Sequence, residues 1–460
     1  LDDAVSLFSR DPASGELIER LVVAADDVVD GLEGDQSLVA SADGAYLYVA
    51  SRISDSVTVF AVGEDAGGAP TLAPVQTVIG RPGLDQAVHV ALSADQATLY
   101  VAGANDDAVA AFARDADSGV LTWIGSVENG VDGVAGLSDV SHVVPAPDGE
   151  QVYALSPTTG SIAVFDRAVD GSLSWRRRYD GMDFPVDLAG ASSAVFDAEG
   201  RFLYVAAQQD SRIVVLARDT SATATRGELA FASAIDQSDE GVNGLFGVAR
   251  LAISGDGVHV YATSPQSDTV AWFIRDGDTG GLRYGGLRGS QDGSVPGLDG
   301  VTGVVVDDVL SQVWVAGTAD AAIGAFRRQA DSFCPASGNG PLVDVPFNVG
   351  AGGSVVFTVD VDIAGDATGS VDNTVELNAA RDTDADNNAA VASSPVSGEA
   401  DLAITKTDGL AEIDGLEGAR DVAAATDHVY VAGAGENALT VLSRRTDPER
   451  ADYGETGFVQ

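Results

Sequence analysis

The sequence predicts an all-β fold built from one four-stranded unit that recurs along the chain. Two passages show the unit clearly, "LSADQATLYVAGANDDAVAAFARDADSGVLTWIGSV" from residue 92 and "ISGDGVHVYATSPQSDTVAWFIRDGDTGGLRYGGL" from residue 253. Each strand is short, rich in β-branched residues and bounded by Asp, Gly or Ser, which is the pattern of strands joined by turns. No 3.6-residue apolar period appears, and this excludes a helical solenoid.

Two markers fix the period of the repeat. An aromatic residue of the second strand recurs at Tyr48, Tyr100, Tyr153, Tyr204, Tyr261, Trp314 and Tyr430. A large apolar residue of the third strand recurs at Phe8, Phe60, Phe112, Phe165, Leu216, Phe273, Phe326 and Leu442. Four strands in each period of about fifty residues are typical of a β-propeller blade, because radially packed sheets leave only short edges exposed.

The number of blades follows from these markers with one ambiguity. The third-strand marker occurs once more than the second-strand marker, because the chain opens with a third and fourth strand at 1–22 and no first two. A single blade cannot bury both its faces, so the blades must close a ring. We predict seven blades, or eight if a preceding segment supplies the two strands that the opening hairpin lacks.

The repeat resembles the lactonase-like, YVTN-type β-propellers of bacteria. The likeness is carried by "SADGAYLYVASRISDSVTVF" at 41–60 and "RDADSGVLTWIGSV" at 114–127, together with their counterparts in the other repeats. It implies propeller blades over 1–328, starting mid-blade. It also implies further propeller strands over 408–460. These strands would close either the ring of their own chain or that of a neighbouring copy. Such propellers serve both as enzymes and as surface modules, so the resemblance predicts the fold more sharply than the activity.

Between these two parts the repeat is interrupted. The passage "AGGSVVFTVDVDIAGDATGSVDNTVEL", followed by "DTDADNNAAVASSPV" and "ADLAITKTDG", resembles the Ig-like conserved-repeat domain of bacterial surface proteins. We therefore expect an Ig-like β-sandwich over 329–407. The resemblance also implies a partner for Cys334, the chain's single cysteine, in a half of the domain that is absent before it, so the pairing of this cysteine stays open.

Composition limits the classes of partner. Lys and Arg number 25 against 70 Asp and Glu, a net charge of −45, which repels nucleic acid and anionic membranes. No apolar run reaches the roughly 18 residues of a membrane-spanning helix. The chain begins at Leu1 and not at Met, as a processed piece of a longer polypeptide would. We expect an extracellular or cell-surface location.

One position of the first strand can be compared between repeats, because first strands line the central channel of a propeller. Two histidines, an arginine and an aspartate around one channel could bind an anion or transfer protons. The alternative is that a water-filled channel simply needs small or polar walls. The predicted channel ring is Ser37, His89, His142, Ser193, Arg250, Gly303 and Asp421.

Metal and catalytic motifs are sparse. Asp382, Asp384 and Asp386 alternate in "RDTDADNNAA" and could hold calcium, or the segment could be a turn between strands. No other cofactor is expected. The sequence lacks HExxH, GxSxG and a phosphate-binding loop, which favours a protein that is not an enzyme.

Three functions remain open at this point. The blades at both ends of the chain are incomplete, which favours an extracellular structural or adhesive protein. In such a protein, 401–460 and the 1–22 hairpin would exchange strands between copies. Such head-to-tail contacts would build a filament or surface layer. The first alternative is a secreted lactonase-like hydrolase that uses the channel ring. The second is a module that binds a ligand or a protein without catalysis.

Overall fold

The computed structural model describes most of the first three hundred residues and short stretches beyond them. The described residues are 4–10, 17–24, 31–65, 70–289, 298–308, 312–319, 322–328, 370–376, 389–395, 419–424, 428–433 and 438–443. Contacts divide the chain into two units, Leu1–Gly353 with Leu410–Gln460, and Ser354–Gly409. Each unit is described by itself.

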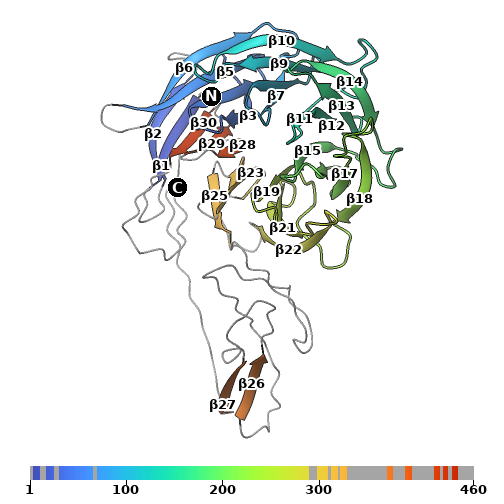
Figure 1. The fold of residues 1–460 in the computed structure, drawn as a ribbon. Helices are drawn as coiled ribbons and strands as arrows, with labels where there is room; N and C mark the ends of the chain where they lie inside the picture. The colour runs from blue at the N-terminus through green and yellow to red at the C-terminus, as the bar shows by residue number, and fades with distance from the viewer. Residues whose placement is uncertain are drawn as a thin grey trace. The chain divides into compact units, whose positions relative to one another are not determined.

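The first unit is an all-β propeller, as the repeat predicts. Six of its sheets, called blades 1 to 6 here, are each built from consecutive strands that pair antiparallel (Figure 1). Blades 1 to 3 are β3 (Asp35–Ala40), β4 (Tyr46–Ser51), β5 (Ser56–Glu64) and β6 (Pro70–Ile79); β7 (Ala87–Leu92), β8 (Thr98–Gly103), β9 (Ala108–Arg114) and β10 (Leu121–Glu128); and β11 (His142–Pro145), β12 (Gln151–Ser156), β13 (Ser161–Arg167) and β14 (Leu173–Tyr179). Blades 4 to 6 are β15 (Ala191–Phe196), β16 (Phe202–Ala207), β17 (Arg212–Arg218) and β18 (Leu229–Asp236); β19 (Arg250–Ile253), β20 (His259–Ser264), β21 (Thr269–Arg275) and β22 (Leu282–Gly289); and β23 (Val301–Asp307), β24 (Gln312–Gly317) and β25 (Ala322–Arg327).

The two ends of the chain form one further sheet, called the end sheet here. Its order is β2-β1-β30-β29-β28, from β1 (Ala4–Arg10), β2 (Leu17–Ala24), β28 (Ala419–Ala424), β29 (His428–Gly433) and β30 (Ala438–Ser443). β1 and β30 pair in parallel, with Ala4 opposite Ala438 and Phe8 opposite Leu442. The pairing joins the two ends of one chain, and exchange of these strands between copies stays a prediction.

The blade count differs from the expectation. Six blades are formed by continuous chain, not seven or eight, and the end sheet draws on both termini. The ambiguity arose because β1 and β30 are both third strands of the repeat. The first strands β3, β7, β11, β15, β19, β23 and β28 contact one another in turn around the channel.

Packing between blades follows from the alternation in the second and third strands. Tyr48, Tyr100, Tyr153 and Tyr204 are fully buried, and each packs in an apolar cluster that joins two neighbouring blades. Leu99 of blade 2 thus lies in one cluster with Tyr48 of blade 1. At about 25 cal/mol per Å² of buried apolar surface, these clusters are the main stabilising contacts of the ring.

A polar contact, called the tyrosine clasp here, ties each of these blades to the next. The Tyr153 hydroxyl donates to the Gly227 carbonyl at 2.7 Å and accepts from Arg218 Nε at 2.9 Å. Arg218 Nη2 also pairs with Asp148 of the preceding blade at 2.8 Å. The clasp recurs as Tyr48 with Arg114, Tyr100 with Arg167, and Tyr204 with Arg275.

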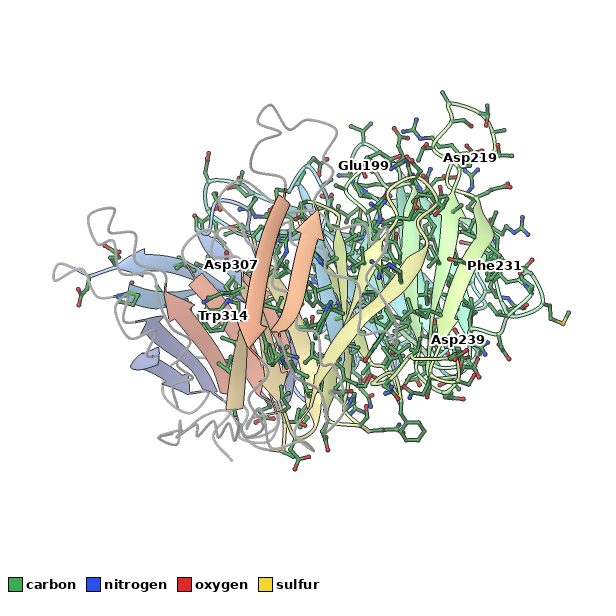
Figure 2. All side chains as sticks on the ribbon, turned by 90° about the horizontal axis from the view of Figure 1, so that it is seen from below. Glu199, Asp219, Phe231, Asp239, Asp307 and Trp314 are labelled. Carbon is green, nitrogen blue, oxygen red and sulfur yellow. The ribbon has the colours of Figure 1, made fainter. Side chains whose placement is uncertain are left out.

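The strands run between two faces of the propeller. In side view, Glu199 and Asp219 lie at one face and Asp239 lies at the other, with Phe231 of the outer strand β18 between them (Figure 2). The turns that join first to second strands share the face of Glu199. Their tight backbone has a left-handed position that favours glycine, as at Gly44 with φ of 71° and Gly149 with φ of 73°, although Gln96 takes it in blade 2.

The second unit is described in two strands only. β26 (Ser370–Glu376) and β27 (Ala389–Pro395) pair antiparallel. A two-stranded sheet is not an Ig-like sandwich, so the expected Ig-like domain is not shown. Cys334 lies outside the described residues, and so does 401–407, where the Ig-like sandwich was expected to end. In the part of the chain that the structure describes, no helix has the length and apolarity to cross a membrane.

Candidate functional site

The predicted channel ring falls on equivalent positions of the first strands. In each sheet the ring residue pairs with the equivalent residue of the second strand, as His89 does with Ala102 and Arg250 does with Thr263. In five sheets a register shift comes immediately before the ring residue, as between Ala87 and His89. Such bulges re-aim a side chain. The shifts before Ser37, Ser193, Gly303 and Asp421 are of the same kind.

Ring side chains also join neighbouring first strands. Ser37 Oγ accepts from the Val90 amide at 3.3 Å. His89 Nδ1 accepts from the Val143 amide at 3.3 Å. One blade pair further, His142 Nε2 lies 3.1 Å from the Ala194 carbonyl. These contacts give the ring residues a structural role in addition to any chemistry.

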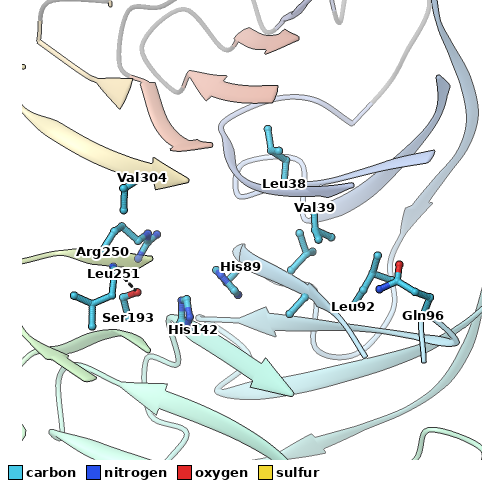
Figure 3. A pocket seen from close by; sticks show the side chains of 12 residues that line it. Leu38, Val39, His89, Leu92, Gln96, His142, Ser193, Arg250, Leu251 and Val304 are labelled. Atoms are coloured by element: carbon cyan, nitrogen blue, oxygen red, sulfur yellow. Dashed lines mark hydrogen bonds between the residues drawn. The ribbon is translucent and has the colours of Figure 1, made fainter. Parts of the chain in front are cut away.

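Four of the ring residues meet at one cavity. The cavity has a volume of about 320 Å³, within the size range of small-ligand sites, and His89, His142, Ser193 and Arg250 line it (Figure 3). Gln96, Val39, Ala91 and Leu92 also line the cavity, and so do four apolar residues that follow ring positions, Leu38, Val90, Leu251 and Val304. The sequence could have predicted these four apolar residues, since each comes one position after a ring residue.

Hydrogen bonds fix the tautomers of the two histidines. Because His89 Nδ1 accepts a backbone proton, a neutral His89 carries its own proton on Nε2. Because His142 Nε2 faces a carbonyl oxygen, it is the donor, and Nδ1 of a neutral His142 has a free lone pair. His142 is only 7% exposed, and its Nδ1 is buried with no hydrogen-bond partner. An orphan acceptor in a polar cavity is a place where a ligand gains a hydrogen bond.

Electrostatics keep both imidazoles neutral. Burial, followed by the positive charge of Arg250, lowers the pKa of His142 to about 3, although its bond to the Ala194 carbonyl acts in the opposite direction. Burial also holds the pKa of His89 well below its usual value, with His142 and Arg250 adding to the effect. At neutral pH the cavity therefore presents one cation, Arg250, beside two uncharged rings.

The structure describes the other predicted site residues only in part. Ser37 is fully buried and contacts Val90 without lining the cavity. Gly303 lies on β23, and Asp421 lies on β28, whose side chains are not described. The proposed calcium ligands Asp382, Asp384 and Asp386 lie outside the described residues. Within the described part, no group of three or more His, Cys, Asp or Glu side chains could hold a metal ion.

Solved structures show the same fold at low sequence identity. A putative 6-phosphogluconolactonase from Bacteroides uniformis is 18% identical with a TM-score of 0.52, covering 70% of this chain and 87% of that chain. A protein from Lactobacillus plantarum is 18% identical with a TM-score of 0.53, covering 72% and 93%. A protein of unknown function from Desulfotomaculum acetoxidans is 14% identical with a TM-score of 0.52, covering 71% and 89%. At these identities the likeness shows the fold alone.

Sequence comparison gives the family. No curated protein matches this chain. The family model described as "Lactonase, 7-bladed beta-propeller" matches residues 1–131, 89–226 and 193–296, which include the four ring residues that line the cavity. These matches together span more than half of the 460 residues, so the chain belongs to the lactonase family of β-propellers.

Proposed function

We propose that this propeller hydrolyses a lactone in the channel cavity. The observation that carries the proposal is His142, a neutral buried imidazole whose Nδ1 has no partner and which shares one cavity with Arg250. Membership of the lactonase family favours this hydrolase, the first alternative predicted from the sequence, over the structural protein that was the main prediction. Secretion and strand exchange between copies stay predictions.

The reaction needs a base, a group that stabilises the oxyanion and a proton donor. Water attacks the carbonyl carbon of the lactone and gives a proton to His142 Nδ1, while the carbonyl oxygen becomes an oxyanion. The Arg250 guanidinium and the Nε2–H of His89 stabilise that oxyanion. The intermediate collapses as the ring C–O bond breaks, and His142 returns its proton to the leaving alkoxide. The product is a hydroxy acid.

In this mechanism, water and substrate must reach His142 Nδ1, which is buried. His142 Nδ1 has no solvent contact, and the His89 ring lies with its centroid 3.8 Å from that of His142. The two rings must therefore shift relative to each other when water and substrate bind. Near-attack geometry is often assembled only in the substrate complex.

A pair of variants tests the function. We expect His142→Gln to lower kcat for lactone hydrolysis by about 10²-fold or more, the contribution typical of a general base. Ser37→Ala is the matched control, because it removes an equivalent contact between first strands but lies outside the cavity. Full activity of folded His142→Gln, or no hydrolysis by the unmodified chain of any lactone from four- to seven-membered rings, would refute the proposal.

A further inference from the structure

The loop that joins blade 4 to blade 5 contains an Asn-Gly pair, Asn243–Gly244. The loop connects β18 to β19, and Asp239 of the same loop lies at one face of the propeller (Figure 2). Asn243 is exposed, whereas Gly244 is buried. Asparagine is a thermolabile residue. It is most labile before glycine, because a residue without Cβ lets its backbone nitrogen approach the preceding side chain closely.

A second Asn-Gly pair in the described part of the chain, Asn129–Gly130, is held by hydrogen bonds. Asn129 Oδ1 accepts from the Leu137 amide at 3.3 Å, which fixes the carboxamide group. The Gly130 amide donates to the Val134 carbonyl at 2.8 Å. Deamidation would require the Gly130 nitrogen to attack the Asn129 carboxamide, and both of these groups are engaged in other contacts.

The two loops share one framework, in which Asn129 and Asn243 take different positions. Gln237 is the equivalent of Asn129, because its Oε1 accepts from the Leu245 amide at 2.6 Å. Asn243 belongs to "VNGL", which corresponds to "VAGL" in the loop that enters blade 3, so its equivalent there is Ala135. Since an alanine fills this position in one loop, the framework does not depend on the Asn243 carboxamide.

Deamidation of Asn243 needs no reactant other than water. The Gly244 backbone nitrogen attacks Cγ of Asn243 and loses its proton, the C–N bond of the carboxamide breaks, and ammonia leaves. Water then opens the resulting succinimide ring at one of its two carbonyl carbons. One opening gives aspartate, and the other gives isoaspartate, in which the backbone runs through Cγ. The sum consumes one water and releases one ammonia.

We propose that Asn243 is a site of spontaneous deamidation in the folded chain, and that the fold protects Asn129 from the same reaction. The exposed Asn243 has the reactive neighbour and lacks the structural role that holds Asn129 in place. This inference does not depend on the proposed hydrolase function.

The modification changes the loop in two ways. Both products add a negative charge, and isoaspartate also lengthens the backbone by one methylene group between Val242 and Leu245, which are both buried. The Gly244 carbonyl accepts from Thr269 Oγ1 at 3.0 Å and so ties the loop to blade 5. The added length displaces these groups, and packed interiors tolerate added atoms poorly. The isoaspartate form is therefore less stable than the unmodified chain.

Peptide mapping of the full chain by mass spectrometry tests the site. In mildly alkaline buffer we expect Asn243 of the folded chain to deamidate at least about tenfold faster than Asn129. In urea, where neither loop is folded, the two rates should agree within about threefold. Asn339 also precedes a glycine but lies outside the described residues, and its peptide is followed separately. Asn129 reacting as fast as Asn243 in the folded chain, or Asn243 reacting only in urea, would overturn the inference.

Thermal unfolding tests the consequence and separates charge from backbone length. Asn243→Asp adds only the charge and should keep a Tm close to that of the unmodified chain. Wild type that has been aged until Asn243 is converted should have a lower Tm. Asn243→Ala is the matched control, because alanine occupies the equivalent position at Ala135, and its Tm should not change on ageing. Equal losses of Tm in aged wild type and aged Asn243→Ala would refute a destabilising modification at this loop.

Discussion

The imidazole rings of His89 and His142 lie with their centroids 3.8 Å apart and their planes tilted by 40°. They come from the first strands of neighbouring blades, β7 and β11, and each accepts or donates one hydrogen bond to the next blade. Two rings at this distance repel each other when both are protonated. The pair therefore links the protonation of the channel to the stability of the ring of blades.

Acid should destabilise the propeller through these two histidines. Their pKa values are lowered in the folded chain, to about 3 for His142, whereas an unfolded histidine titrates near 6.5. The unfolded state then binds more protons below pH 6.5, so stability is complete above that pH and falls as the pH drops. Between pH 7 and 5.5 we expect a loss of about 1 kcal/mol for each histidine in urea unfolding.

The histidine variants isolate this effect from that of the carboxylates. His142→Gln should remove about half of the loss between pH 7 and 5.5. Asp95 and Asp148, whose pKa values are also lowered, add their own acid sensitivity mainly below about pH 5, because an unfolded aspartate titrates near 3.9. The same slope in wild type and His142→Gln would show that this imidazole is not buried neutral.

The tyrosine clasp should differ in strength between blades. Arg275 donates to the Tyr204 hydroxyl at 2.6 Å and pairs with Asp197, whose side chain is fully buried. Arg275→Ala leaves that carboxylate without its main partner, so we expect a cost of about 3–5 kcal/mol in the free energy of unfolding.

Arg114 provides the comparison. It makes the same bond to Tyr48, at 2.6 Å, but its Nη2 is buried without a partner. Arg114→Ala therefore leaves no buried carboxylate behind and should cost less than Arg275→Ala in denaturant unfolding. Equal losses would mean that the clasp acts through packing and the tyrosine bond alone, without the ion pair.

Replacing Gly103 on β8 should destabilise the chain, because there is no space for a side chain at this position. A Cβ at Gly103 would lie 2.4 Å from the Gly83 carbonyl oxygen, which is backbone and cannot move aside. Gly103→Ala should therefore destabilise the chain by about 1–3 kcal/mol, the range for overpacking. At Gly125 a Cβ would meet nothing within 4 Å, so Gly125→Ala serves as the control and should be close to neutral in thermal unfolding.

The sequence predicted the strands of the blades because they follow the repeat. The sequence also contains a pattern from which we predicted nothing. An arginine follows the third-strand marker by two positions, as at Arg114, Arg167 and Arg218. Those arginines form the tyrosine clasp. The meeting of His89 with His142 and the tautomer of each could not be read, because they depend on side-chain rotamers and on backbone groups of the neighbouring blade.

The closure of the ring was ambiguous for a related reason. The segments "AVSLFSR" and "ALTVLSR" are both third strands, so the repeat alone does not say which one pairs with β29. In the structure β30 takes that place, and β1 lies beside it in parallel register. The other strand pairs that the structure describes in blades 1 to 6 and in the end sheet are antiparallel, so this parallel junction departs from the pattern.

A cross-link distinguishes closure within one chain from exchange between copies. Leu7 lies opposite Val441 in the β1–β30 pair, and neighbouring strands place Cα atoms within the reach of a disulfide. We expect Leu7→Cys/Val441→Cys, made with Cys334→Ser, to form a disulfide within a monomer on oxidation. The matched control is Leu7→Cys/Leu439→Cys, which is two residues out of register and should cross-link more slowly. A ladder of disulfide-linked dimers and higher oligomers on a non-reducing gel would instead establish exchange between copies, because the two cysteines would then have met only across different chains.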